Sequence, residues 1–307
     1  MTETRQLIAG TRGSPMALVQ TDKVIAHLTG RHPELMIATK TITTKGDAND
    51  APIPLDTVGK EWFTKEIEDE LIERNIDFAV HSLKDVPPEL PPGLMILPVL
   101  PRDDPRDAVI ATTATTLATL PKGAIVGTDS LRRKTLLLKE RPDLQVKSIR
   151  GNANTRLQKL EAGDFDALIM AAAGLERIGR TEMITEYLDG TTFVPSIGQG
   201  TLAVEIRTAR TDLITLFTEL QDEACRQATM AEQAFAEVIG GGCKLPVACY
   251  VQIETGTAHI YGMVGSIDAA QCVIGSLQGA ATEAVGLARQ LAHKLAQEPF
   301  VAEYARF

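Results

Sequence analysis

Two parts of this 307-residue chain repeat one order of strand and helix patterns, and this internal echo limits its possible folds most strongly. Residues 8–11 (IAGT) precede a helical pattern, as residues 125–128 (IVGT) precede a later one. Residues 77–80 (DFAV) then correspond to residues 166–169 (DALI). The segments between them form a third pair, residues 41–47 (TITTKGD) and 148–152 (SIRGN). Three echoes in one order predict two similar βα lobes that face each other across a cleft.

The predicted fold class is α/β, with two periplasmic-binding-protein-like (type II) lobes around a cleft and a small C-terminal α+β domain. An apolar strand at residues 202–206 is expected to return to the first lobe. A helix that stops at a triple glycine and is followed by strands and another helix marks the third domain. The predicted boundaries are residues 1–100 and 201–220 for lobe 1, 101–200 for lobe 2 and 221–307 for the C-terminal domain. We expect hinging near Arg102 and Val194.

Composition narrows the function classes. The formal net charge of −9 disfavours a nucleic-acid binder, so any anion is expected to be small and locally bound. The N-terminus has no apolar signal segment and no apolar run is long enough to span a bilayer, which predicts a cytoplasmic protein. The four cysteines show no CxxC pair, and the histidines show no metal-ligand spacing. Reduced thiols and no bound metal are therefore expected.

A strand tip at residues 78–88 (FAVHSLKDVPP) gathers hydroxyl, ammonium and carboxylate groups. The apolar strand ends at two prolines, and ligands bind at strand ends in open α/β sheets. Asp85 beside Lys84 could hold or shuttle positive charge on a ligand. The alternative is a solvated loop without a function. His81 reads as a structural residue rather than a catalytic one.

Arginines follow several predicted strands or begin helices. A chain of negative net charge that collects guanidinium groups at strand ends suits a ligand with several carboxylates or phosphates, because arginine binds such groups through two hydrogen bonds. Scattered surface arginines are the alternative for each one taken singly. Ser14 is a predicted helix N-cap with Pro15 at the first helical position. The arginines in question are Arg12, Arg132, Arg133, Arg150 and Arg156.

Cys243 directly follows three glycines, which suits a loop whose backbone approaches a ligand closely. A free thiol there could act as a nucleophile or as a covalent anchor. The alternative is a small buried residue, which is the better interpretation for Cys225 and Cys249.

Six motifs in the same order together resemble the porphobilinogen deaminase (hydroxymethylbilane synthase) family. The likeness runs from Ile8 into the C-terminal domain. The motifs are residues 80–87 (VHSLKDVP), 127–133 (GTDSLRR), 149–156 (IRGNANTR), 172–175 (AAGL), 198–200 (GQG) and 241–243 (GGC) with Pro246.

The resemblance implies a transferase of porphyrin, tetrapyrrole and haem biosynthesis. Such an enzyme condenses four porphobilinogen molecules head to tail onto a dipyrromethane cofactor, releases ammonia at each step, and frees hydroxymethylbilane by hydrolysis. It implies that Cys243 holds the cofactor through a thioether, and that the protein is a monomer. The porphobilinogen side chains are acetate and propionate, which explains the arginines.

The resemblance also assigns roles by position. Asp85 matches the catalytic aspartate, and the adjacent Lys84 is also assigned to the catalytic site. The cofactor positions are Cys243, Ser82, Lys84, Asp85, Thr128, Ser130, Arg132 and Arg133. The substrate positions are Arg12, Ser14, Lys60, Phe63, Arg150, Arg156 and Gln199.

Two departures from the family pattern stand out. Asp129 occupies a position that is often serine, where an acid would repel cofactor carboxylates unless it points away or pairs with an arginine. Asp56 and residues 58–62 (VGKEW) alter a predicted mobile loop. A two-lobed binding protein without turnover and an inactive homologue are the alternative functions.

Overall fold

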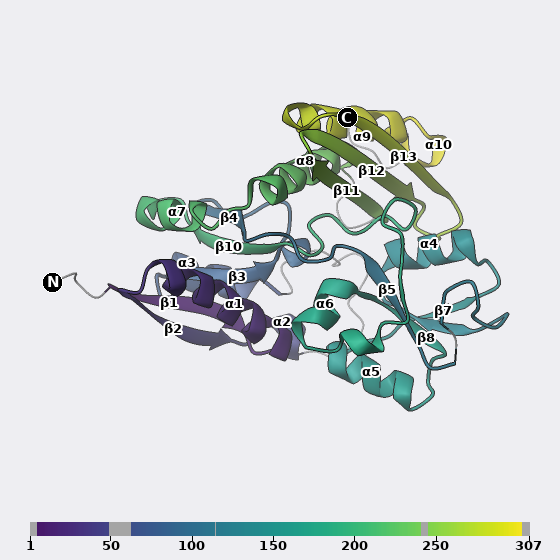
Figure 1. The fold of residues 1–307 in the computed structure, drawn as a ribbon, viewed down its shortest axis with the longest axis horizontal. Helices are drawn as coiled ribbons and strands as arrows, with labels where there is room; N and C mark the ends of the chain where they lie inside the picture. The colour runs from purple at the N-terminus through teal and green to yellow at the C-terminus, as the bar shows by residue number, and fades with distance from the viewer. Residues whose placement is uncertain (1–4, 49–62, 114, 241–244, 303–307) are drawn as a thin grey trace. The chain divides into compact units, whose positions relative to one another are not determined.

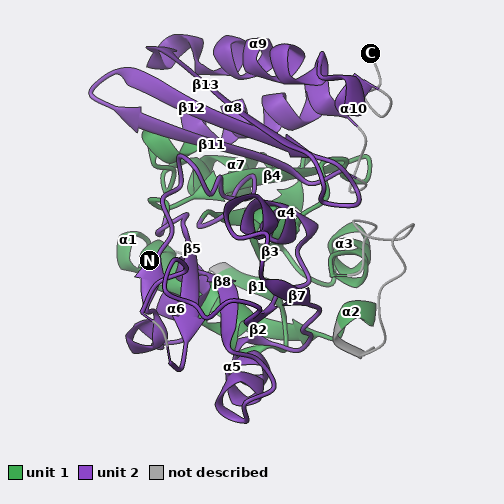
Figure 2. Cartoon of the chain, turned by 90° about the vertical axis from the view of Figure 1, so that its right-hand side faces the viewer, with its two compact units in different colours: residues 1–53, 59–102, 201–226 green, residues 54–58, 103–200, 227–307 purple. Residues whose placement is uncertain are grey.

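The computed structural model describes residues 5–48, 63–113, 115–240 and 245–302. The chain divides into two compact units (Figure 2). Unit 1 contains residues 1–53, 59–102 and 201–226, and unit 2 contains residues 54–58, 103–200 and 227–307. The predicted division into three domains stays a prediction.

Unit 1 is built on a five-stranded sheet of order β2-β1-β3-β10-β4 (Figure 1). β1 pairs in parallel with β2 and β3, whereas β10 is antiparallel to both β3 and β4. The predicted return of the chain to this lobe at residues 202–206 is therefore confirmed. The strands are β1 (Arg5–Arg12), β2 (Leu35–Ile42), β3 (Phe78–Ser82), β4 (Leu94–Val99) and β10 (Leu202–Arg207). The helices are α1 (Pro15–Arg31), α2 (Lys45–Ala48), α3 (Lys65–Ile72), the 3₁₀ turn η1 (Leu83–Asp85) and α7 (Thr211–Thr218).

Unit 2 repeats this arrangement in a sheet of order β7-β6-β8-β5-β9. β6 is parallel to β7 and β8, and β5 is antiparallel to β8 and β9. The strands are β5 (Asp107–Ala111), β6 (Ile125–Gly127), β7 (Gln145–Lys147), β8 (Ala167–Ala171) and β9 (Glu186–Tyr187). The helices are α4 (Leu131–Glu140), α5 (Ala153–Glu161), α6 (Ala172–Arg177) and the turn η2 (Thr181–Met183).

Matched aspartates link corresponding strands of the two sheets. In unit 1 the Ile8 amide donates to Asp77 Oδ2 over 2.8 Å, and in unit 2 the Ile125 amide donates to Asp166 Oδ2 over 2.7 Å. Each aspartate lies just before the strand that pairs with the strand of its isoleucine. The sequence echo thus reflects one repeated topology.

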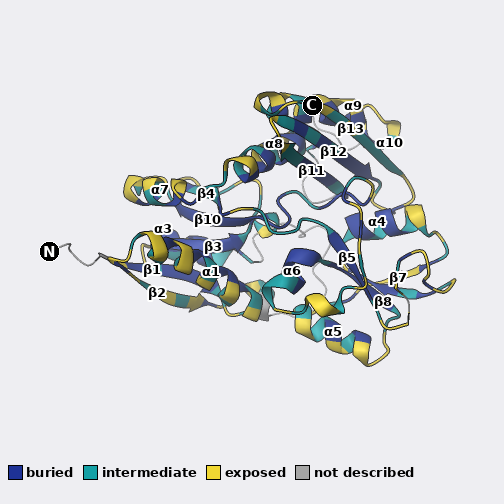
Figure 3. Ribbon diagram, viewed as in Figure 1, coloured by how far each residue is buried: buried dark blue, intermediate teal, exposed yellow. Residues whose placement is uncertain are grey.

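Burial follows this topology (Figure 3). The central strands β3, β10, β5 and β8 are buried at nearly every position, as expected for strands covered on both faces. Phe78 of β3 packs edge-on against Phe217 of α7, with 4.9 Å between ring centroids.

The C-terminal part of unit 2 is a three-stranded antiparallel sheet of order β11-β12-β13, packed with helices. Phe235 of α8 and Leu291 of α9 lie in its core and are fully buried. The predicted fold class, two mixed α/β lobes and a C-terminal α+β region, is confirmed. The elements are α8 (Glu223–Ile239), β11 (Val247–Glu254), β12 (Thr257–Gly265), β13 (Cys272–Ala280), the turn η4 (Ala281–Glu283), α9 (Ala284–Ala296) and α10 (Pro299–Ala302).

Some elements have no counterpart in the sequence analysis. Residues 45–48 form the single helical turn α2. The strands β5 and β9 were not anticipated, because β5 begins with a charged residue after a proline-rich segment and β9 has only two residues. Within the described residues, no helix is long and apolar enough to cross a membrane.

Candidate functional site

A cavity of about 50 Å³ lies at the strand tip of unit 1. It brings together five residues that the sequence predicted for the site: Arg12, Ser14, Phe63, Ser82 and Asp85. Met16, Ala17, Gln20, Thr64, Val80 and His81 complete its lining.

The buried side chain of Leu83 anchors the turn at the end of β3. β3 ends at Ser82, and the 3₁₀ turn η1 follows with Leu83 pointing inward at 6% exposure. The Leu83 amide donates to the Thr201 carbonyl over 3.0 Å. Asp85 is left exposed at the cavity, and Lys84 is half-buried. The buried Leu83 therefore anchors the backbone of the turn, and the Asp85 carboxylate stays accessible to a ligand.

The start of α1 forms another wall of the cavity. The predicted N-cap is confirmed, since Ser14 Oγ accepts from the Ala17 amide over 3.2 Å and Pro15 begins the helix. Gln20, one turn further, donates through Nε2 to Ser82 Oγ over 2.8 Å. The Arg12 guanidinium lies 4.2 Å from the centroid of the Phe63 ring, a cation–π contact.

His81 carries a buried carboxylate partner on the neighbouring strand. Its Nε2 lies 2.9 Å from Glu205 Oε2, and the two side chains are 5% and 0% exposed. Glu205 Oε1 has no hydrogen-bond partner. The pairing agrees with the expectation of a structural histidine, although the ring also lines the cavity.

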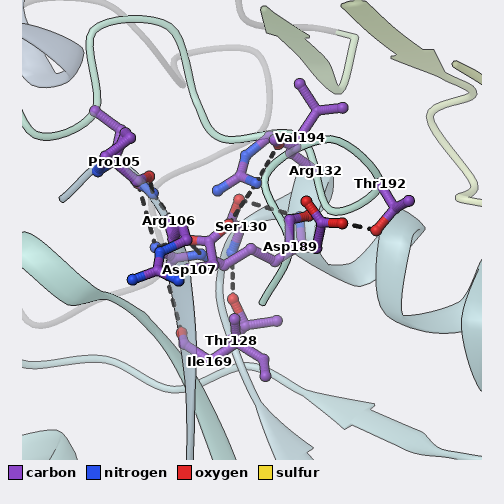
Figure 4. Close-up of polar contacts among 12 residues, drawn as sticks. Pro105, Arg106, Asp107, Thr128, Ser130, Arg132, Ile169, Asp189, Thr192 and Val194 are labelled. Carbon is purple, nitrogen blue, oxygen red and sulfur yellow. Dashed lines mark hydrogen bonds and ion pairs between the residues drawn. The ribbon is translucent and has the colours of Figure 1, made fainter. Parts of the chain in front are cut away.

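In unit 2, two arginines predicted to hold the cofactor, Arg132 and Arg133, converge on the buried Asp107. Figure 4 shows Arg132 beside Asp107. Arg132 Nη1 donates to Asp107 Oδ2 over 2.6 Å and to the Val194 carbonyl over 2.8 Å. Arg133 donates to Asp107 Oδ1 through Nε at 3.0 Å and Nη2 at 2.8 Å, and to the Ile169 carbonyl at 3.0 Å. We call these residues, together with Gln199, the Asp107 cluster.

Asp107 stays ionised within this cluster. Burial alone would raise its pKa, but the charges and hydrogen bonds of Arg132 and Arg133 outweigh burial and hold the pKa well below its usual range. Gln199 Nε2 also donates to Asp107 Oδ1 over 3.0 Å and to the Pro105 carbonyl over 2.7 Å. Both guanidinium groups thus share this one buried carboxylate as an ion-pair partner.

The start of α4 holds the predicted hydroxyl residues. Ser130 is the N-cap and accepts from the Arg133 amide over 3.4 Å. Thr128 Oγ1 accepts from the Ser130 amide over 3.2 Å. This turn sets the backbone from which both arginines enter the Asp107 cluster.

Asp129, the unusual acid, is paired with an arginine. Arg150 Nε lies 3.2 Å from Asp129 Oδ2, and Ser148 Oγ donates to Asp129 Oδ1. Arg156 Nε donates to the Gly151 carbonyl over 2.8 Å. Arg150 therefore forms an ion pair within the protein, with Asp129, in addition to any contact with a ligand.

The sequence analysis missed the central residue of unit 2 and a partner at the tip of unit 1. Asp107 begins β5, a strand that the sequence did not predict, and its partners lie 25 or more positions away. Gln20 had a detectable signal, because it is a polar residue on the buried stripe of α1 formed by Ala17, Thr21, Val24 and Leu28.

Arg177 was also missed. It donates through Nε to Asp103 Oδ2 over 2.8 Å and through Nη2 to the Gly200 carbonyl over 2.7 Å. Gly200 has a φ of 88°, and a side chain there would meet the Asp103 carbonyl oxygen, so only glycine fits. These contacts fix the turn that carries Gln199.

Some predicted residues lie outside the described part of the chain. Lys60, Asp56, residues 58–62 and the proposed anchor Cys243 belong to this group. Within the described residues, no group of three or more histidine, cysteine or acidic side chains is arranged to hold a metal ion.

Known structures of low sequence identity include periplasmic binding proteins. A periplasmic substrate-binding protein of an ABC transporter from Coxiella burnetii is 14% identical with a TM-score of 0.43, covering 71% of this chain and 93% of that one. An arginine-specific periplasmic binding protein of Salmonella typhimurium is 12% identical with a TM-score of 0.40, covering 72% and 93%.

Sequence comparison gives stronger matches. Residues 7–215 match the family described as "Porphobilinogen deaminase, dipyromethane cofactor binding domain", and residues 226–297 match "Porphobilinogen deaminase, C-terminal domain". A porphobilinogen deaminase of Syntrophomonas wolfei is 43% identical over 295 residues, covering 96% of both chains. One from Bacillus subtilis is 44% identical over 267 residues, covering 86% of this chain and 85% of the relative. The chain belongs to the porphobilinogen deaminase family.

Proposed function

We propose that this chain catalyses the reaction of its family, the stepwise condensation of four porphobilinogen molecules with release of ammonia, followed by hydrolytic release of hydroxymethylbilane. One observation carries the proposal. Five side chains with predicted roles, drawn from β1, α1, β3 and the segments beside them, line a single cavity in unit 1.

The donors in unit 2 suit a dipyrromethane cofactor. A pair of pyrrole rings with acetate and propionate groups needs cationic and hydroxyl donors. The Asp107 cluster supplies two guanidinium groups from the helix that begins beside Thr128 and Ser130. We assign Thr128, Ser130, Arg132 and Arg133 to the cofactor carboxylates, and by resemblance Ser82, Lys84 and Asp85. Bound through the Cys243 sulfur, dipyrromethane supplies the free pyrrole carbon on which condensation begins.

The residues of unit 1 are assigned to stabilise the positive charge that develops in the reaction and to bind the substrate carboxylates. Loss of ammonia and formation of the new carbon–carbon bond pass through positively charged pyrrole species, which a fixed carboxylate stabilises. Asp85 is the acidic residue lining the cavity in the described part of the chain. Arg12 and Ser14 are assigned to the substrate carboxylates, and the Phe63 ring to the face of a pyrrole.

Further substrate contacts are assigned to Arg150, Arg156 and Gln199, and to Lys60. Hydrogen bonds from Arg156 to Gly151 and from Gln199 to Pro105 order the backbone around these residues. A cytoplasmic location and the absence of a nucleic-acid partner are predictions from the sequence, and a monomeric state is what the family resemblance implies.

The direct test is turnover by the purified chain. Incubation with porphobilinogen is expected to release one ammonia per porphobilinogen consumed, and to form hydroxymethylbilane, detected as uroporphyrin after ring closure and oxidation. Binding of porphobilinogen without ammonia release would favour the two-lobed binding protein or the inactive homologue instead.

A further inference from the structure

Thr64 holds a buried hydroxyl that the fold does not use. The residue is 1% exposed, and among the described residues its Oγ1 has no hydrogen-bond partner. It is also part of the lining of the cavity in unit 1, next to Phe63. Buried hydroxyl groups without partners are unfavourable, because folding removes their hydrogen bonds to water.

Thr64 lies at a helix position where its hydroxyl would ordinarily form a capping hydrogen bond. Thr64 is the N-cap of α3, where a threonine side chain ordinarily accepts a hydrogen bond from the first turn. Here the side chain makes no cap bond. The Thr64 carbonyl instead accepts from the amides of Ile67 and Glu68 over 2.9 Å and 2.8 Å. The helix therefore begins without help from the hydroxyl.

The neighbouring groups define what a ligand at this hydroxyl would be. The Arg12 guanidinium lies over the Phe63 ring, one residue before Thr64. Ser14 Oγ uses a lone pair for the Ala17 amide, so its proton can be donated elsewhere. A cation and two hydroxyl donors lining one cavity suit a carboxylate.

The acidic residues of α3 oppose an anion but do not line the cavity. Glu66 and Glu68 lie in the first turn of the helix. Asp85 lines the cavity, where it would repel a carboxylate placed beside it. A bound carboxylate must therefore be neutralised by Arg12 and lie on the Thr64 side.

We propose that Thr64 is a substrate-binding residue, whose hydroxyl donates a hydrogen bond to a carboxylate of porphobilinogen alongside Arg12. This inference rests on the proposed function, because it takes porphobilinogen as the ligand. The binding of substrate supplies the partner that the free protein lacks.

Thr64→Val tests the proposal, since valine keeps the shape and removes only the hydroxyl. We expect KM for porphobilinogen to rise about 5-fold, the loss of one hydrogen bond, with a small change in kcat. The melting temperature of the enzyme without substrate should stay the same or rise, because the lost group had no partner. The separate variant Thr64→Ser keeps the hydroxyl, so its KM for porphobilinogen should stay near that of the unsubstituted enzyme.

Thr21→Val is the matched control. Thr21 is equally buried, but its Oγ1 donates to the Ala17 carbonyl over 3.0 Å. This variant should lower the melting temperature by about 2–4 °C and leave KM unchanged.

Two results would overturn the inference while leaving the function intact. One is an unchanged KM in Thr64→Val, and the other is a loss of thermal stability like that of Thr21→Val. If the unsubstituted enzyme neither binds nor converts porphobilinogen, the proposed function and this inference fail together.

Discussion

The cavity in unit 1 and the Asp107 cluster in unit 2 occupy sheets of the same strand order but differ in how their polar groups are satisfied. In the cluster, Asp107 accepts from both arginines and from Gln199. Among the described residues lining the cavity, Thr64 Oγ1 is a buried side-chain atom without a hydrogen-bond partner. In the described part of unit 2, no buried side-chain nitrogen or oxygen lacks a hydrogen bond.

This difference in hydrogen bonding distinguishes a site that holds a permanent cofactor from a site that binds a substrate repeatedly. A cluster whose bonds are already made holds its donors in place before a ligand arrives, which suits a permanently attached cofactor. A cavity hydroxyl without a partner, such as that of Thr64, gains its hydrogen bond only when a ligand enters, which suits a substrate that binds and is consumed repeatedly. The following substitutions test this contrast, from the largest expected effect to the smallest.

Asp107→Asn should have the largest effect on stability. It leaves two buried guanidinium groups without their anion, and breaking a buried ion pair on one side costs about 3–5 kcal/mol. Urea unfolding should show this loss, and mass spectrometry should show less protein carrying the cofactor. Asp143→Asn removes a carboxylate from an arginine pair nearer the surface and should change stability much less. Equal effects would contradict the distinct role of the cluster.

The pH dependence of this loss follows from the depressed pKa of Asp107. A lowered folded-state pKa gives stability that is fully present above the unfolded-state pKa of about 3.9 and is lost as pH falls toward the folded-state value. The stability difference between the unsubstituted protein and Asp107→Asn should therefore be constant from about pH 8 to pH 5. It should shrink only below about pH 4, and shrinkage near neutral pH would contradict the assignment.

Asp85→Asn should have the largest effect on turnover. Loss of the carboxylate that stabilises positive charge is expected to lower kcat by about 10²–10³-fold. The side chain is exposed, so the free energy of unfolding should change little. Asp22→Asn, an exposed carboxylate on α1 that does not line the cavity, should leave both quantities unchanged. Undiminished turnover by Asp85→Asn would remove the residue from the mechanism.

Glu205→Gln addresses the buried pair behind the cavity. The amide can still accept from His81, but its NH₂ group brings donors to a site where Glu205 Oε1 already has no partner. We expect a loss of about 1–3 kcal/mol in the free energy of unfolding, measured in urea at neutral pH. His27→Gln on the exposed face of α1 is the control and should be neutral. An unaltered stability in Glu205→Gln would show that the pair does not support the strands.

Asp129→Ser should have the smallest effect. It releases Arg150 from an ion pair whose side chains are about one-third exposed, and such pairs contribute about 0.2–1 kcal/mol. KM for porphobilinogen is expected to fall about 2–4-fold, because Arg150 and the substrate carboxylates no longer compete with Asp129. In an Arg150→Gln background the same substitution should have no effect on KM. A higher KM would mean that Asp129 orients Arg150 for the substrate.

Local patterns in the sequence predicted much of this arrangement. The cap Ser14, the returning strand β10 and the paired echoes of the two lobes each depend on neighbouring residues or on periodicity. Arg12, Ser14, Ser82 and Asp85 could be collected because they lie at or just after the ends of recognisable strands, whereas Phe63 was assigned by the family resemblance.

Long-range partners could not be predicted in the same way. Nothing near Asp107 signals that Arg132, Arg133 and Gln199 converge on it, since those contacts depend on β5 pairing with β8 some 60 positions along the chain. Thr64 was overlooked for a related reason, because a missing hydrogen bond is visible only after all neighbours are placed.

The most direct test is the intact mass of the purified protein and of Cys243→Ser, with peptide mapping around residue 243. The account predicts that the unsubstituted protein exceeds its polypeptide mass by two linked pyrrole units on Cys243, and that Cys243→Ser has the bare mass. An unsubstituted protein that stays bare after incubation with porphobilinogen, or a Cys243→Ser protein that still carries covalent pyrrole, would contradict it.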